Sequence, residues 1–310
     1  MPRREPFAVL LERALEKREG LRKGGVEAFR AFNGTADGLD GVFIDVYGPG
    51  ASLMVYEDRA RMPDPAATLD VLSPAGVRAV YVKPFARDRS RLGGTMPPVA
   101  TDPNPAAGER LAESFTIREG EARLEVRLYD GLSTGLFLDQ RDNRRWAGQW
   151  TRQRLKAGRT ADVLNTFAYT CSFSVAAALA GAATTSVDVS ARYLEWGRRN
   201  FTHNALDPQA HRFARMDVFE FFAYARRKNL QFDLIILDPP SFSAGSRRRG
   251  IRPWSAERDY PRLVSEAAGL VRGGGTVFAS TNTQELCRPG VLAELVRRAL
   301  KGRPKRIDLL

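Results

Sequence analysis

From residue 160 onward, short strand-like runs alternate with amphipathic stretches of helical periodicity. This spacing predicts strands at residues 162–165, 186–189, 213–216, 232–237 and 276–279, with a sixth at 306–309. Helices are expected at residues 173–181, 191–203, 218–228, 257–271 and 289–300. Such alternation is typical of a parallel sheet with crossover helices. The run 232–237 is nearly all apolar, as expected of a central strand that is covered on both faces.

The first 130 residues follow a different pattern. A basic amphipathic helix is expected within residues 5–23, before Gly24 and Gly25. Strands are expected at 42–46, 52–56, 79–82, 114–118 and 122–128, with a helix at 65–76 and an exposed loop at 93–108. We therefore predict a basic N-terminal helix at 1–27, a small mixed β-rich domain at 28–130 and an α/β domain with a mostly parallel sheet at 131–310.

Composition narrows the classes of protein and partner. The 48 basic and 36 acidic residues give a net charge of +12, which favours a polyanion such as nucleic acid; the alternative is a basic surface that only aids solubility. Cys171 and Cys287 stand in no metal-ligand or disulfide spacing, so we expect no metal site and a cytoplasmic protein. No apolar run approaches the roughly 18 to 20 residues of a membrane span, and no signal peptide is visible at the start, so no membrane is expected.

Ligands of an open parallel sheet bind outside the carboxyl ends of its strands. The first strand is followed by Leu164-Asn-Thr-Phe-Ala-Tyr-Thr-Cys-Ser-Phe173, which lacks the G-x-G-x-x-G pattern and so disfavours a nicotinamide or flavin oxidoreductase. Asp188 ends the second strand, 23 residues after Asn165, where a carboxylate commonly binds a ribose diol. Asp217 ends the third strand, where it can meet an adenine edge. For both residues, capping of the next helix is an equal alternative.

The fourth strand ends in Asp238-Pro-Pro-Ser-Phe242. Two consecutive prolines cannot extend a strand ladder and they fix φ, so Asp238 and the carbonyls are held rigidly at the strand end. These acceptors suit the N–H groups of a flat heterocycle, on which Phe242 can stack. In the alternative interpretation Pro-Pro only ends the strand and Phe242 belongs to the core.

Four segments carry a resemblance to a known family. Asp238-Pro-Pro-Ser-Phe242, Gly135-Leu-Phe-Leu-Asp-Gln-Arg-Asp-Asn-Arg144 and Leu164-Asn-Thr-Phe-Ala-Tyr-Thr170 resemble class I S-adenosylmethionine-dependent ribosomal RNA methyltransferases. Among these, the large-subunit cytosine-C5 family and the related guanine-N7 enzymes are the most similar. The stretch from Arg30 to Gly48 resembles the start of their small β-rich domain, called EEHEE. Together these segments extend the resemblance over residues 28–300, and it implies a Rossmann-like methyltransferase domain.

The resemblance implies S-adenosylmethionine as cofactor and ribosomal RNA as partner. The residues matching its cofactor-binding positions are Phe137, Asp139, Gln140, Arg141, Phe167, Tyr169, Thr170, Asp188, Asp217 and Asp238. Asp238, Pro239, Pro240 and Phe242 match the positions that face the methyl group and the target base. We expect Arg247, Arg248 and Arg249, together with the basic N-terminal helix, to contact RNA. The protein is expected to be a monomer or a homodimer.

Two departures from the family pattern affect the function. Thr170-Cys171-Ser172 stands where relatives have glycines, so a Cβ there can crowd the cofactor. Cytosine-C5 enzymes place a cysteine at the end of the fifth strand, where this chain reads Ala279-Ser-Thr-Asn282. Attack at C5 requires a thiolate, whereas guanine N7 has its own lone pair. We therefore expect guanine N7 as the target; the alternatives are cytosine C5 or a non-catalytic RNA-binding or ribosome-assembly protein that keeps the fold.

Overall fold

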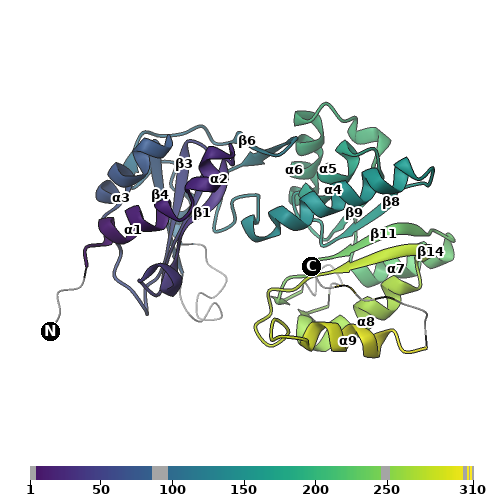
Figure 1. The fold of residues 1–310 in the computed structure, drawn as a ribbon. Helices are drawn as coiled ribbons and strands as arrows, with labels where there is room; N and C mark the ends of the chain where they lie inside the picture. The colour runs from purple at the N-terminus through teal and green to yellow at the C-terminus, as the bar shows by residue number, and fades with distance from the viewer. Residues whose placement is uncertain (1–4, 86–96, 246–251, 303–305, 307, 309–310) are drawn as a thin grey trace. The chain divides into compact units, whose positions relative to one another are not determined.

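The computed structural model describes residues 5–85, 97–245, 252–302, 306 and 308, and Figure 1 draws it as a ribbon. The chain divides into two compact units, Met1–Asp142 and Asn143–Leu310. Each unit has its own large sheet and its own apolar core. Within the described residues, no helix is both long enough and apolar enough to cross a membrane.

The first unit contains a five-stranded mixed sheet in the order β1-β2-β3-β4-β5. Its strands are β1 (Ala28–Asn33), β2 (Val42–Tyr47), β3 (Gly50–Tyr56), β4 (Ala79–Phe85) and β5 (Ala107–Gly108). Only β3 and β4 run parallel to each other; the other neighbours are antiparallel. The connection between β2 and β3 is tight, because Tyr47 pairs with Gly50. A separate hairpin joins β6 (Phe115–Glu119) and β7 (Ala122–Val126).

The sequence predictions for the strands and loops of this unit were wrong at two places. β1 was not predicted, because apolar and polar residues do not alternate strictly along it. Its apolar residues Phe29, Ala31 and Phe32 nevertheless pack in the core. The stretch 93–108 was expected to be an exposed loop, but β5 at its end pairs with β4. Gly108 has a φ of +91°, and a Cβ there would lie 2.0 Å from the carbonyl oxygen of Arg78. Glycine therefore allows the backbone at this point to approach the backbone of Arg78, just before β4.

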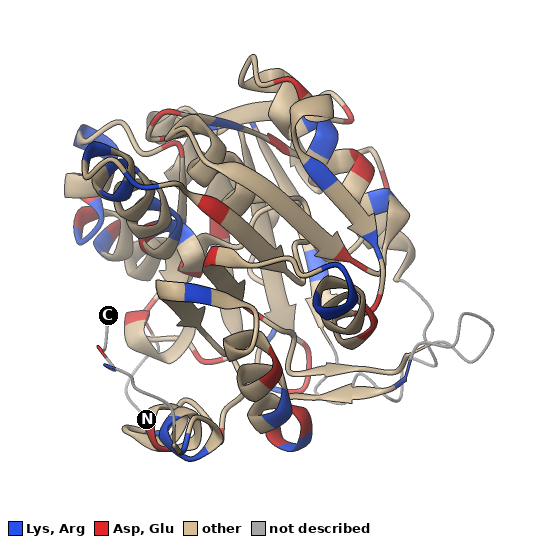
Figure 2. Cartoon of the chain, turned by 90° about the vertical axis from the view of Figure 1, so that its right-hand side faces the viewer, with Lys and Arg blue, Asp and Glu red and all other residues tan. Residues whose placement is uncertain are grey.

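The N-terminal basic segment forms two helices where one was expected. They are α1 (Phe7–Glu16) and α2 (Glu19–Lys23). The third helix of the unit, α3 (Pro65–Leu72), follows β3. Lys17 and Arg18 lie at the break and bind Asp37, at 3.1 Å and 2.5 Å between nitrogen and oxygen. Two of the charges that we expected to contact RNA are thus paired within the unit. Figure 2 shows basic and acidic segments interspersed along the chain.

The second unit is a five-stranded sheet in the order β10-β9-β8-β11-β14, with all neighbours parallel. Its strands are β8 (Asp162–Thr166), β9 (Ala183–Asp188), β10 (Arg212–Arg215), β11 (Phe232–Leu237) and β14 (Val271–Ala279). Its helices are α4 (Arg141–Lys156), α5 (Ser172–Leu179), α6 (Ala191–His203), α7 (Val218–Arg227), α8 (Ala256–Ala268) and α9 (Val291–Ala299). The Rossmann-like fold and the parallel sheet are confirmed, as is the additional mixed sheet of the first unit.

Helices cover both faces of this sheet, as Figure 1 shows. Leu234 and Ile236 of β11 pack with residues of α4 and α5, while Ile235 and Leu237 pack with residues of α7 and α8. Alternate side chains of a strand point to opposite faces, so a central strand between two helical layers is expected to be apolar at nearly every position. This explains the nearly continuous apolar run that the sequence shows from residue 232 to 237, in which Asp233 near the start of the strand is the exception.

β14 begins five residues earlier than the sequence predicted. Three glycines, at positions 273, 274 and 275, argue against a strand, and the pairing with β11 is irregular there. Gly274 has a φ of +73°, and a Cβ on Gly275 would lie 2.7 Å from the carbonyl oxygen of Asp233. The strand therefore contains a bulge that depends on glycine. Of the sixth strand expected at 306–309, residues 307 and 309 lie outside the described residues.

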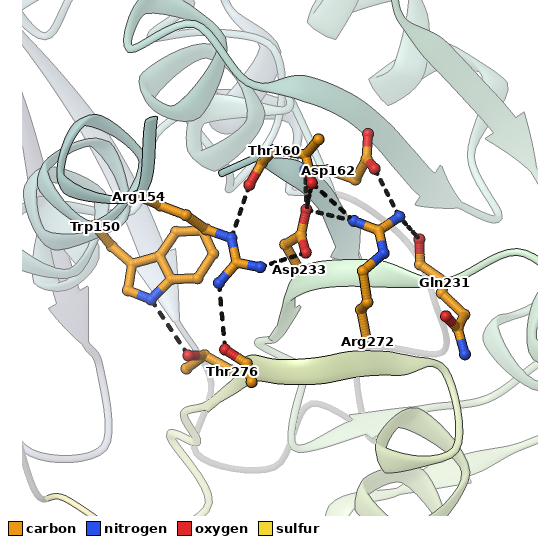
Figure 3. A network of polar contacts seen from close by, with 9 residues as sticks. Trp150, Arg154, Thr160, Asp162, Gln231, Asp233, Arg272 and Thr276 are labelled. Carbon is orange, nitrogen blue, oxygen red and sulfur yellow. Dashed lines mark hydrogen bonds and ion pairs between the residues drawn. The ribbon is translucent and has the colours of Figure 1, made fainter. Parts of the chain in front are cut away.

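A polar network lies where β8 and β11 begin (Figure 3). The carboxylate of Asp233 is fully buried and accepts hydrogen bonds from Arg154 at 2.6 Å, Arg272 at 2.6 Å and Thr160 at 2.9 Å. Arg272 also bonds Asp162 at 2.9 Å. Because these residues come from α4, β8, β11, β14 and a loop, the network joins the starts of three strands to a helix.

Candidate active site at the carboxyl ends of the second sheet

The strands of the second sheet end in register at one edge. Leu237 at the end of β11 pairs with Thr166 of β8 on one side and with Ala279 of β14 on the other. Asp188 ends β9 beside the end of β10, with which it pairs through Arg215. The structure therefore brings the four predicted strand-end segments of this unit to the same edge. In this strand order the chain reverses direction of winding between β8 and β11, which is where ligands of such sheets bind.

The loop after β8 has an unusual backbone. Phe167, Tyr169 and Cys171 have φ values of 52°, 50° and 62°, a region that residues other than glycine rarely adopt. Each such residue costs about 1 to 3 kcal/mol, so the surroundings must hold the loop in place. Asn200 does so from α6, because its side-chain amide donates to the carbonyl of Thr170 at 2.8 Å. Backbone strain of this kind is typical of loops that contact ligands.

Asp188 fixes the other side of this loop. One carboxylate oxygen accepts from the backbone N–H of Tyr169 at 2.9 Å, and the other accepts from the N–H of Ser190 at 2.8 Å. The N-cap of α6 is Ser190, whose hydroxyl accepts from the backbone N–H of Tyr193. The alternative role of Asp188 as the cap of this helix is therefore wrong. A carboxylate has about four acceptor positions. Binding of a ribose by the half-buried Asp188 is compatible with these bonds and stays a prediction.

Asp217 caps α7. Its carboxylate accepts from the backbone N–H of Phe219 at 2.9 Å, which is one of the two roles that the sequence allowed. A capping residue at a helix N-terminus lies at the strand end as well, so contact with an adenine edge is compatible with this role. It stays a prediction.

The Asp238-Pro-Pro loop is fastened from two sides. The hydroxyl of Ser280, after β14, donates to the Asp238 carboxylate at 2.5 Å. The indole N–H of Trp254 donates to the carbonyl of Pro240 at 2.6 Å. Trp254 is itself buried and packs against Phe167, with 5.1 Å between the ring centroids. The carbonyl of Pro240, which the sequence offered as an acceptor for a base, thus already has one partner within the unit.

Phe242 lies beside this loop and is exposed. It belongs to the short strand β12 (Phe242–Ser243), which pairs with β13 (Trp254–Ser255). With 67% of its surface accessible, Phe242 is not part of the core, so that alternative is wrong. An exposed aromatic ring at a ligand-binding edge can stack on a base. The predicted RNA-contacting residues Arg247, Arg248 and Arg249 lie outside the described residues.

The remaining predicted cofactor residues lie near the end of the first unit. Phe137 is half exposed and precedes a short 3-10 helix, Leu138–Gln140. Gln140 is buried, and Arg141 begins α4. Burial lowers the pKa of Arg30, but the Asp45 carboxylate and, by smaller amounts, Tyr47 and Asp139 raise it, so that the net shift is upward. The cofactor role of these four residues stays a prediction.

Cys171, at a position where the family resemblance led us to expect glycine, points into the protein. It is fully buried against α6, where a Cβ on Gly197 would lie 2.4 Å from the Cys171 sulfur. The cysteine is therefore accommodated by a glycine opposite it. Burial raises the pKa of the Cys171 thiol to about 12, so it stays protonated at neutral pH and is not a nucleophile.

We expect Gly197→Ala to destabilise the second unit by about 1 to 3 kcal/mol, because the new methyl group overlaps the Cys171 side chain. Urea unfolding followed by tryptophan fluorescence measures this unit alone, since all four tryptophans, at 146, 150, 196 and 254, belong to it. In a Cys171→Gly background the same change should be tolerated or stabilising, because alanine favours a helix over glycine. An equal loss in both backgrounds contradicts this packing.

Sequence reasoning missed the partners that hold the loops. Ser280 and Asn282 were noted only for the absence of a cysteine, although polar residues directly after an apolar strand were the signal that identified Asp238. Cys287 lies in a turn before α9, and its thiol contacts the carbonyl of Thr281 at 3.3 Å. Among the described residues, no three His, Cys, Asp or Glu side chains gather as metal ligands.

Several known proteins resemble this chain in sequence. The sequence profile of S-adenosylmethionine-dependent methyltransferases matches residues 99–302. YwbD of Bacillus subtilis, whose name describes a ribosomal RNA large subunit methyltransferase, is 39% identical over 259 residues, which is 83% of this chain and 61% of YwbD. The chain thus spans less than two thirds of that relative.

Two solved structures resemble the whole chain. SMU.776, described as a methyltransferase and crystallised with S-adenosylhomocysteine, is 30% identical; the match covers 98% of this chain and 74% of that one, with a TM-score of 0.78. A protein of Streptococcus mutans described as an S-adenosylmethionine-dependent methyltransferase is 29% identical; the match covers 96% and 72%, with a TM-score of 0.76. On its profile, its fold and these relatives, the chain belongs to the S-adenosylmethionine-dependent methyltransferase family.

Proposed function

We propose that this protein transfers a methyl group from S-adenosylmethionine to a base of large-subunit ribosomal RNA. The observation that carries the proposal is the Asp238-Pro-Pro loop, held at the strand ends by Ser280 and Trp254 with the exposed Phe242 beside it. The net charge of +12 supports a polyanionic substrate, and the name of YwbD supports ribosomal RNA. Such a substrate is expected in the cytoplasm.

The residues of the second unit fit the cofactor. In the proposed complex Asp188, at the end of β9, accepts hydrogen bonds from the ribose hydroxyls, and the strained loop 167–171 passes beside this carboxylate. S-adenosylmethionine supplies an electrophilic methyl group when it is bound. In the proposed reaction Phe242 stacks on the target base, while the Asp238 carboxylate accepts hydrogen bonds from the N–H groups of that base. A base that is alkylated at a ring nitrogen gains positive charge, which the Asp238 carboxylate stabilises.

We propose guanine N7 as the target atom. A C5 carbon becomes nucleophilic only after a thiolate attacks C6 of the same ring. β14 is followed by serine, threonine and asparagine, and the buried Cys171 keeps its proton. Guanine N7 requires only alignment with the methyl group and exclusion of water. Catalysis at this site is then a matter of positioning.

Cytosine C5 is the second candidate, because Cys287 is exposed and its thiol contacts Thr281 just beyond the end of β14. The non-catalytic alternative rested on crowding by Cys171, whose side chain is instead buried against α6. We propose that Arg247, Arg248 and Arg249 contact the RNA backbone. We also propose that the first unit, which resembles an EEHEE domain, contacts the RNA.

The target atom is testable by mass spectrometry of ribosomal RNA nucleosides from cells with and without this gene. We expect 7-methylguanosine at one large-subunit position to disappear with the gene, and the purified protein to restore it to that RNA with labelled S-adenosylmethionine. Loss of 5-methylcytidine instead selects the second candidate. If no base changes and no label is transferred, the proposed function is wrong.

Cys287→Ala separates the two candidates within the protein. For attack by guanine N7 the thiol has no role, so we expect the rate of methyl transfer to change less than about twofold. The parallel Cys171→Ala variant serves as the control for loss of a thiol that is not at the strand end. A covalent RNA–protein adduct that forms in the wild type and is lost in Cys287→Ala contradicts the N7 assignment.

A further inference from the structure

Two hydrogen bonds join the loop after β11 to the loop after β14. The Ser280 hydroxyl donates to Oδ1 of Asp238 at 2.5 Å, and the Ser241 hydroxyl donates to Oδ1 of Asn282 at 2.7 Å. The first and fourth residues of Asp-Pro-Pro-Ser are therefore each tied to the neighbouring strand end. The two partners of each bond are distant in the sequence, by 42 positions for Asp238 and Ser280 and by 41 for Ser241 and Asn282.

The backbone of Ser280 is fixed before its side chain is considered. Its N–H donates to the carbonyl of Leu237 at 2.9 Å, which continues the pairing of β11 with β14. Its carbonyl accepts from the hydroxyl of Tyr260 at 2.6 Å. Tyr260 comes from α8 and is fully buried, and burial raises the pKa of its phenol, so the hydroxyl keeps the proton that it donates. The side chain of Ser280 thus projects from a backbone held on both sides.

Because the backbone of Ser280 is fixed, its hydroxyl has few possible positions. In this structure the hydroxyl donates to the carboxylate of Asp238. The terminal torsion of an aspartate is broad, so an unsupported carboxylate samples a range of planes. A donor on one oxygen narrows that range. A carboxylate has about four acceptor positions, so accepting from Ser280 does not exhaust its capacity for the N–H groups of a base.

We propose that Ser280 is a positioning residue of the methyl-transfer reaction, setting the plane of the Asp238 carboxylate that receives the target base. Asn282 acts alongside it by anchoring Ser241, so that the whole Asp-Pro-Pro-Ser loop keeps its place relative to β14. This inference rests on the proposed function. It also gives a role to the end of β14, the segment in which the family resemblance places the cysteine of a cytosine-C5 enzyme: in this chain Ser280 there supplies a donor to the carboxylate.

The test compares Ser280→Ala with Ser280→Thr, which keeps the hydroxyl. With ribosomal RNA from cells that lack the gene, we expect Ser280→Ala to lower kcat by about 10- to 100-fold, the range typical of a misplaced group in an active site. The Kd for S-adenosylmethionine and the urea midpoint should stay close to wild type, and Ser280→Thr should recover most of the rate. Ser73→Ala, which removes an exposed hydroxyl of the first unit, is the matched control.

A double-mutant cycle identifies the partner. If Ser280 acts through Asp238, then Ser280→Ala added to Asp238→Asn should cause little further loss, so the two effects are far from additive. Additive effects, or a loss of cofactor binding and stability in step with the loss of rate, overturn the inference. An unchanged kcat in Ser280→Ala overturns it as well.

Failure of the proposed function gives a different result, because the wild type then transfers no methyl group to RNA. In that case crystal structures of the wild type and Ser280→Ala decide the geometry. The inference expects the Asp238 carboxylate to turn when the hydroxyl is removed. An identical carboxylate orientation in both crystals overturns it.

Discussion

Replacing Asp238 by Asn is expected to lower kcat/KM for methyl transfer by about 100- to 1000-fold, the cost typical of removing one group that stabilises charge in a transition state. The amide cannot compensate positive charge on the base, and it presents a donor where the carboxylate has only acceptors. Transfer of labelled methyl groups to ribosomal RNA from cells without the gene measures the rate.

The same variant should keep its fold. Asp238 is half buried on a loop, and its hydrogen bond with Ser280 contributes about 1 kcal/mol to stability. The tryptophan-detected urea transition is therefore expected close to that of the wild type. Asp207→Asn is the matched control, because Asp207 is an exposed aspartate that caps a 3-10 helix before the start of β10. An Asp238→Asn protein with wild-type turnover removes this carboxylate from the mechanism.

Asp233→Asn is expected to destabilise the second unit by about 3 to 5 kcal/mol, since it leaves two arginines beside a neutral side chain in a buried network. The carboxylate of Asp233 is fully buried and the Arg154 side chain is only 10% exposed, so solvent replaces little of the attraction in that pair. The Arg272 side chain is 36% exposed, so solvent compensates more of its loss. Urea unfolding followed by tryptophan fluorescence measures the change. Glu294→Gln, which breaks an exposed ion pair with Arg298, should cost less than about 1 kcal/mol.

The contribution of Asp233 should depend on pH. Burial alone raises the pKa of this carboxyl, but hydrogen bonds from the Asp162 N–H, Thr160 and Arg272 outweigh it, and the folded-state pKa lies below the ordinary value. Stability from such a group is complete above its unfolded pKa of about 3.9 and is lost as pH falls through the lower folded pKa. The difference between wild type and Asp233→Asn should thus be constant from pH 7 to 5 and shrink below about pH 4. A constant difference down to pH 2 contradicts this assignment.

Local patterns in the sequence determined most of the second unit. The nearly continuous apolar run 232–237 identified a strand covered on both faces. The helix α6 has the bounds predicted for it, because Ser190 caps it and its apolar residues recur at helical spacing. The polar residues after the strands identified the edge at which the candidate site lies. These features depend on residues close together in the chain, which is why their spacing alone reveals them.

Positions governed by distant residues needed the tertiary structure. The sequence could not place Cys171 against Gly197, the bulge of β14 against the carbonyl of Asp233, or Lys17 and Arg18 on Asp37. Nor could it pair Ser280 with Asp238, since which strand end meets which follows from the order and register of the sheet. The sequence by itself determined the fold class, the family resemblance and the residues at the strand ends. Only the packed sheet decided which of them hold one another, because contacts between distant residues exist only once the strands are aligned.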